Sequence, residues 1–90
     1  MRAAVDISMY PLIGDYRVPI QAFIDRLNTH TGVTVHTNAL ATQIWAPLDR
    51  IMAILTEEMT RSAAAGGAPQ MVFVMKVLPG LAPPDPATAA

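Results

Sequence analysis

The first clear pattern along the chain is an alternation with period two from Ala3 to Tyr10. Apolar side chains take the odd positions, and an acid, a hydroxyl and a phenol take the even ones, namely Asp6, Ser8 and Tyr10. Such alternation predicts a strand with one face on a core. The pattern returns in residues 33–37, and a third, apolar strand is expected in residues 40–45 after a turn at Asn38-Ala39. We therefore expect the second and third strands to pair as a hairpin.

Two segments carry apolar residues at helical spacing. The first begins at Val18-Pro19, where a first-turn proline costs no hydrogen bond, and Gly32 is its expected stop signal. Its apolar stripe comprises Ile20, Phe23, Ile24 and Leu27. The second helix is expected from Pro47 to the glycine pair at 66–67. Its predicted buried stripe comprises Leu48, Ile51, Met52, Leu55 and Met59, and its predicted solvated side comprises Glu57, Glu58 and Arg61.

The last element is an uninterrupted apolar run over residues 71–78, in which Lys76 is the only charge. Such a run predicts a strand that is buried on both faces. Residues 81–90 are rich in Pro and Ala and lack periodicity. We therefore predict one domain over residues 1–80 and a disordered tail over residues 81–90.

The order strand, helix, strand, strand, helix, strand is that of the split βαβ, ferredoxin-like arrangement. Right-handed crossovers place both helices on the same side of the sheet. We predict an α+β fold of the ferredoxin-like βαββαβ type. Its four-stranded antiparallel sheet has the spatial order 4-1-3-2, with two helices on one face.

Composition narrows the possible partners. Of the 90 residues, 52 % are apolar and only 14 % are charged, which is well below the usual quarter. The helix-free sheet face then needs a cover, and we expect a homo-oligomer, a dimer or tetramer, that forms through sheet faces. A net charge of −1 without a basic stripe argues against nucleic acid. No apolar run approaches the roughly 18 residues of a membrane span, and no signal peptide is recognisable. We expect a cytoplasmic protein without membrane insertion.

The chain offers little for catalysis. It contains no Cys, and neither of its histidines, His30 and His36, has a ligand-type partner at helical spacing. No nucleophile–base pair is evident either. We therefore expect no enzymatic activity, no metal and no cofactor. The functions that remain are those of a small-molecule binding module or of an assembly unit.

The polar residues of the central strands are the candidate binding groups. The third strand carries Thr42, Gln43 and the only tryptophan, Trp45, although alternation puts Thr42 on the opposite face from the other two. The full candidate set comprises Asp6, Ser8, Tyr10, Asn38, Thr42, Gln43 and Trp45. An alternative interpretation is that solvent or a subunit interface satisfies these groups.

Four blocks of sequence resemble the thiamine-binding proteins of the YkoF kind. They are Ile7-Ser8-Met9-Tyr10-Pro11-Leu12, Tyr16-x-x-Pro19-Ile20-x-x-Phe23-Ile24-x-x-Leu27, Asn38-Ala39-Leu40-Ala41-Thr42-Gln43-Ile44 and Val72-Phe73-Val74-x-Lys76-Val77. The resemblance implies a ferredoxin-like domain that assembles through its sheets. It also implies a non-catalytic binder of thiamine or its hydroxymethylpyrimidine half, which acts in thiamine salvage or uptake.

The side chains suit such a ligand. An aminopyrimidine presents donors and ring acceptors, which Gln43, Asn38, Thr42 or Ser8 could match. A thiazolium cation would favour the carboxylate of Asp6 or the aromatic rings of Trp45 and Tyr10. The alternative hypothesis is a structural or regulatory oligomeric module with the same fold and no small-molecule ligand.

Overall fold

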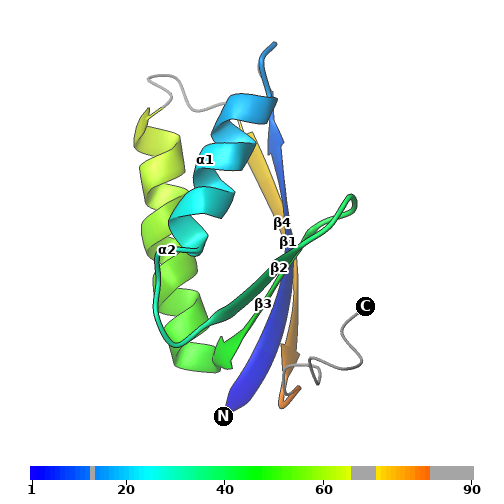
Figure 1. Cartoon of the computed structure of the whole chain (residues 1–90), viewed down its shortest axis with the longest axis vertical. Coiled ribbons are helices and arrows are strands. Elements are labelled where there is room, and N and C mark those ends of the chain that lie inside the picture. The colour runs from blue at the N-terminus through cyan, green and yellow to red at the C-terminus, as the bar shows by residue number, and fades with distance from the viewer. Residues whose placement is uncertain (13, 66–70, 82–90) are drawn as a thin grey trace.

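The computed structural model describes residues 1–12, 14–65 and 71–81. These residues form two layers, a sheet and a pair of helices on one of its faces (Figure 1). The elements in chain order are β1 (Arg2–Pro11), α1 (Arg17–Leu27), β2 (Thr34–Thr37), β3 (Thr42–Pro47), α2 (Leu48–Ala65) and β4 (Met71–Pro79). The sheet has the order β2-β3-β1-β4 and is antiparallel throughout. The predicted ferredoxin-like fold and strand order are confirmed. Residues 82–90 of the predicted tail lie outside the described residues.

The core lies between the sheet and the helices. It is built from the odd positions of β1, as the alternation predicts, together with apolar residues of β3 and of both helices. Its buried members are Ala3, Val5, Ile7, Met9, Phe23, Leu27, Ile44, Ala46, Ile51, Ile54 and Leu55. Fully burying one such Leu, Ile or Phe side chain contributes about 1.5–3 kcal/mol. This layer therefore fixes the sheet face that turns toward the helices.

Helix α1 ends earlier than the sequence suggests. We expected the stop at Gly32, but the last helical residue is Leu27. The side chains of Asn28 and Thr29 donate hydrogen bonds to the carbonyls of Ile24 and Arg26, at 2.9 and 2.6 Å, and so satisfy the free end of the helix. Gly32, with φ of 76°, then turns the chain toward β2. No described helix has the length and apolar character needed to cross a membrane.

The buried side of α2 differs from the predicted stripe in two positions. Met52 is exposed, and Glu58, which was expected on the solvated side, is fully buried. Both differences have one cause. α2 packs against α1 as well as against the sheet, so its buried surface is turned toward Glu58 and away from Met52. The neighbouring helix supplies Arg26, which makes burial of the Glu58 carboxylate possible.

The prediction that the last strand is buried on both faces is wrong. β4 is an edge strand, and the helices pack mainly on β1 and β3. Only Met71 and Phe73 are partly covered, and the Phe73 ring lies 5.2 Å from the Phe23 ring. The apolar run reflects two exposed apolar faces instead of two buried ones.

Candidate functional site

A pocket of about 180 Å³ opens where β1 outruns β3. β1 pairs with β3 only as far as Ile7, which faces Thr42, but it pairs with β4 as far as Pro11. Beyond Ile7 the β2–β3 hairpin leaves the sheet, and its tip projects away from the helices (Figure 1). The end of β1, the start of α1 and the hairpin tip therefore surround a space that no strand fills.

The lining of this pocket is uncharged. It consists of Ile7, Ser8, Met9, Tyr10, Ile20, Phe23, Ile24, Thr37, Asn38, Ala39, Leu40, Ala41 and Thr42. Apolar side chains form most of the walls, and hydroxyls, one phenol and one amide supply the polar groups. A few polar groups in an apolar concavity are the usual features of a small-molecule site. Among the described residues, the lining offers no cation to neutralise a phosphate.

Asn38 holds the hairpin wall in shape. Its Oδ1 accepts the backbone N–H groups of Leu40 and Ala41 at 2.9 and 3.0 Å, and its Nδ2 donates to Oε1 of Gln43 at 3.1 Å. This is the side-chain-supported turn that Asn favours. Its amide groups are therefore engaged within the chain, and Asn38 shapes the pocket more than it offers free hydrogen bonds.

The hydroxyls beside the turn keep spare hydrogen-bonding capacity. Thr37 Oγ1 and Thr42 Oγ1 lie 3.1 Å apart and share one hydrogen bond. Because each hydroxyl is both a donor and an acceptor, the pair still offers one hydrogen atom and free lone pairs. These groups can match a ligand that presents both donors and acceptors.

The seven predicted binding residues divide between two places. Four of them line the pocket, namely Ser8, Tyr10, Asn38 and Thr42. The other three, Asp6, Gln43 and Trp45, lie outside it on the helix-free face of the sheet, hereafter the open face. Alternation along β1 and β3 explains the division. Ser8 and Tyr10 also belong to the open face of β1, but they reach the pocket because β3 has ended beside them.

A polar row crosses the open face. In strand order it contains His36, Gln43, Asp6 and Lys76, which occupy mutually paired positions. Oδ1 of Asp6 is buried, as is Nε1 of Trp45 on the same face. Neither atom has a hydrogen-bond partner among the described residues. Unpaired buried polar atoms are costly, so the open face carries groups that a partner could satisfy.

Sequence reasoning missed the part of the pocket that α1 supplies. Ile20, Phe23 and Ile24 line it together with Thr37 of β2. The three α1 residues belong to the apolar stripe of the helix, and such a stripe predicts residues buried in the core. The sequence did contain one indication. The strands of the β2–β3 hairpin are short, so they cannot cover the whole apolar stripe of α1.

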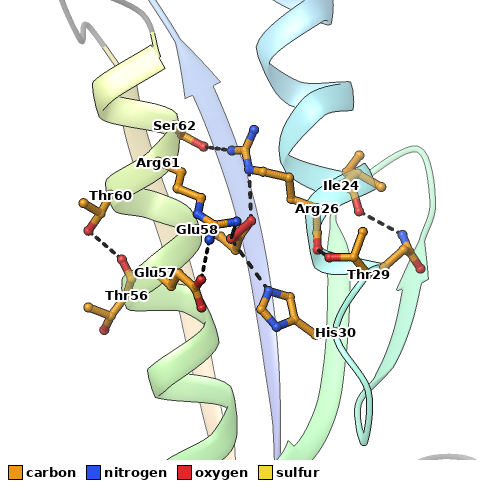
Figure 2. A network of polar contacts seen from close by, with 11 residues as sticks. Ile24, Arg26, Thr29, His30, Thr56, Glu57, Glu58, Thr60, Arg61 and Ser62 are labelled. Carbon is orange, nitrogen blue, oxygen red and sulfur yellow. Dashed lines mark hydrogen bonds and ion pairs between the residues drawn. The ribbon is translucent and has the colours of Figure 1, made fainter.

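A second polar cluster joins the two helices (Figure 2). Oε2 of Glu58 accepts a hydrogen bond from Nε of Arg26 at 2.9 Å. Oε1 of Glu58 accepts none, but Arg61 Nη1 lies 3.3 Å from it and His30 Nε2 lies 3.7 Å from it. The buried carboxylate thus lies beside two guanidinium groups and an imidazole, and the cluster clamps α1 to α2.

The same cluster brings together three groups of metal-ligand type. Ligand atoms of His30, Glu57 and Glu58 lie within 4.8 Å of one another. Arg61, however, donates to Glu57 at 2.7 Å and also contacts Glu58. A cation would have to displace this guanidinium group, so the geometry favours a structural role over metal binding.

Comparison with known proteins supports the fold. A Streptococcus pneumoniae protein matches with a TM-score of 0.80 at 23 % identity, over 90 % of this chain and 89 % of that one. A Thermotoga maritima protein described as a putative thiamine biosynthesis/salvage protein matches with a TM-score of 0.76 at 16 % identity, over 87 % and 83 %. A domain of unknown function, DUF77, from Bacillus cereus matches with a TM-score of 0.73 at 15 % identity, over 99 % and 88 %. No protein-family model and no curated sequence matches. At these identities the likeness shows the fold alone.

Proposed function

We propose that the protein is a non-catalytic binder of thiamine or its hydroxymethylpyrimidine moiety, and that it acts in thiamine salvage or uptake. The observation that carries the proposal is the uncharged pocket between β1, α1 and the hairpin. Support also comes from the sequence blocks that resemble those of thiamine-binding proteins and from the similar fold of the Thermotoga maritima protein. Neither a cofactor nor a metal is required for this role.

The pocket favours the pyrimidine end of the ligand. Its volume of about 180 Å³ is below the roughly 300–1,000 Å³ of typical ligand pockets, so a single ring fits better than the whole vitamin. Phe23 offers an apolar wall, and Ser8 and the Thr37–Thr42 pair offer groups for an aminopyrimidine edge. A thiazolium ring would then lie toward Tyr10, whose half-exposed ring can attract a cation. A phosphate group would remain in solvent.

Calorimetry with hydroxymethylpyrimidine, thiamine and thiamine diphosphate tests the proposal. We expect hydroxymethylpyrimidine and thiamine to bind, and the diphosphate to gain nothing from its phosphates. Ser8→Ala should weaken both by roughly 5- to 150-fold, which corresponds to about 1–3 kcal/mol for an unpaired ligand group.

Gln43→Ala is the matched control, because Gln43 lies on the open face and reaches the pocket only through its hydrogen bond with Asn38, whose Oδ1 contacts with the turn remain in the variant. We expect it to weaken binding less than Ser8→Ala does. If Gln43→Ala has the larger effect, the ligand binds on the open face instead of in the pocket. If the wild-type protein binds none of the three compounds, the alternative below is preferred.

The alternative function is a structural or regulatory oligomeric module without a small-molecule ligand. Its specific support is the open face, where half-exposed Val72, Val74 and Leu78 accompany the unpaired polar atoms of Asp6 and Trp45. In either case we propose that copies of the chain assemble as a dimer or tetramer through their open faces. Such packing would remove apolar surface from water and could supply the missing hydrogen-bond partners.

A further inference from the structure

The two edges of the sheet are built very differently. β2, at one edge, has four residues and exposes Thr34 and His36. β4, at the other edge, has nine residues, and Lys76 is its only charge. A short polar edge is protected from pairing with other strands, whereas a long apolar edge invites it. Within the described part of the chain, no strand pairs with the side of β4 that faces away from β1, hereafter the outer edge.

As far as the described residues extend, the outer edge of β4 is open to another strand. Among the described residues, the helices make their main contacts with β1 and β3, and the α1 contact with β4 runs through Phe23 and Phe73. Met75 and Val77, on the helix side of β4, remain about two-fifths exposed. Alternate residues of an edge strand point their N–H and C=O groups outward, so about half of the nine present unpaired main-chain groups.

We propose that the outer edge of β4 pairs antiparallel with β4 of a second copy and forms a continuous eight-stranded sheet. An antiparallel strand edge is self-complementary, because a two-fold axis brings each donor opposite an acceptor of the other copy. This interface is distinct from open-face packing and independent of the ligand. It uses the strand edge, and it leaves the open face available.

The sequence of β4 selects the register. Pairing all nine residues places the two-fold axis at Met75, so that Met75 faces Met75 of the second copy. Val74 then faces Lys76 of the other copy, and Phe73 faces Val77. A register centred on Lys76 would set two lysines directly opposite, which is unfavourable. In the proposed register Asp6 remains beside each Lys76 within its own chain.

A disulfide crosslink tests this register, because the protein contains no cysteine of its own. Directly opposed residues of an antiparallel pair have Cα atoms about 4.5–5.5 Å apart, which is within the range of a disulfide. Met75→Cys should therefore give a covalent dimer on mild oxidation, seen by non-reducing electrophoresis and intact mass. Open-face packing alone does not predict this product, because Met75 lies on the helix side.

Val77→Cys is the matched control, since Val77 lies on the same side of β4 with nearly equal exposure. In the proposed register the two introduced cysteines of this variant are offset by four positions, or about 13 Å along the strand, and should not crosslink. Equal crosslinking of both variants would overturn the proposal. So would the absence of a dimer in a Met75→Cys protein whose circular dichroism is native.

Hydrogen exchange of the unmodified protein gives a second measurement. We expect alternate amides of β4 to become protected as protein concentration rises, because outward N–H groups gain partners in the dimer. Amides of β2, the short edge, should not change. If the β4 amides exchange rapidly at every concentration, the outer edge is unpaired and the proposal fails.

Discussion

The helix layer and the open face of the sheet differ in what surrounds their buried polar groups. In the helix layer, the Glu58 carboxylate is fully buried. Its Oε2 accepts a hydrogen bond from Arg26 at 2.9 Å, and its Oε1, which accepts none, has the Arg61 guanidinium 3.3 Å away. On the open face, buried atoms of Asp6 and Trp45 have no hydrogen-bond partner among the described residues. The chain thus surrounds its buried carboxylate with its own guanidinium groups, whereas the described residues place no such partner beside the buried atoms of Asp6 and Trp45.

Apolar residues show the same contrast. The helix side places Val5, Ile44 and Leu55 at 1 % exposure or less, whereas Val74 on the open face is 52 % exposed. Substitutions on the helix side should therefore change the stability of the single chain. Substitutions on the open face should change its association.

The largest expected effect comes from breaking the helix-side cluster. Glu58→Gln removes the charge that pairs with Arg26 and leaves that guanidinium without a carboxylate. We expect a loss of about 3 kcal/mol in unfolding free energy, the lower end for a broken buried pair, because Arg26 retains some contact with water. Urea denaturation followed by circular dichroism measures it.

Glu57→Gln is the control for that measurement. It breaks the exposed pair of Glu57 with Arg61 on the same helix. Exposed pairs four residues apart contribute about 0.3–0.5 kcal/mol. Equal losses from the two variants would show that the buried carboxylate is not the clamp between α1 and α2.

An intermediate effect is expected on association through the open face. Val74→Asp places a charge where a second copy should pack, and the lost burial of one valine is about 1.5 kcal/mol, or roughly tenfold in dissociation constant. Sedimentation equilibrium should show a smaller assembly with unchanged monomer stability. Pairing through β4 should survive, because the introduced carboxylate would face Lys76 of the other copy.

Val18→Asp serves as the comparison, because Val18 is 64 % exposed on α1. It makes the same chemical change on the helix side of the molecule. We expect no change in association. An equal effect of both variants would mean that added charge, and not the open face, governs assembly.

The smallest effect is expected at the indole of the open face. Trp45→Phe removes an unpaired N–H but keeps most of the ring, so unfolding free energy should change by no more than about 0.5 kcal/mol.

Thr42→Val is the comparison on the helix side. It breaks the hydroxyl pair with Thr37 and should lower the unfolding free energy by about 1 kcal/mol. Calorimetric melting compares the two. A larger loss for Trp45→Phe would show that the single chain already uses the indole N–H.

The fold was predictable because alternation in β1 and helical spacing in α1 each report a local period. The errors arose where burial depends on a distant element. The sequence around Glu58 resembles a solvated helix face, and only the approach of Arg26, 32 residues away, makes its burial possible. β4 resembles a central strand, because an apolar run does not reveal whether helices cover it.

The candidate site was predictable only in part, because local patterns identify polar residues within strands but do not show which elements surround them. Polar residues within strands, such as Ser8 and Thr42, stand out in the sequence, and both line the pocket. Gln43 was grouped with them, because periodicity cannot show where β3 stops covering β1. Phe23 was missed, since a pocket wall and a core residue share one helical pattern.

The pairing of β1 with β4 also determines how the protein must fold. Pro11 pairs with Met71 and Ala3 pairs with Pro79, so this half of the sheet joins segments 60 and 76 positions apart. The β2–β3 hairpin can form within microseconds, but closing so long a loop delays the last strand. During synthesis β1 leaves the ribosome long before its partner exists. The nascent chain therefore displays one unpaired side of its central strand until β4 emerges, and this interval is when we expect aggregation to compete with folding.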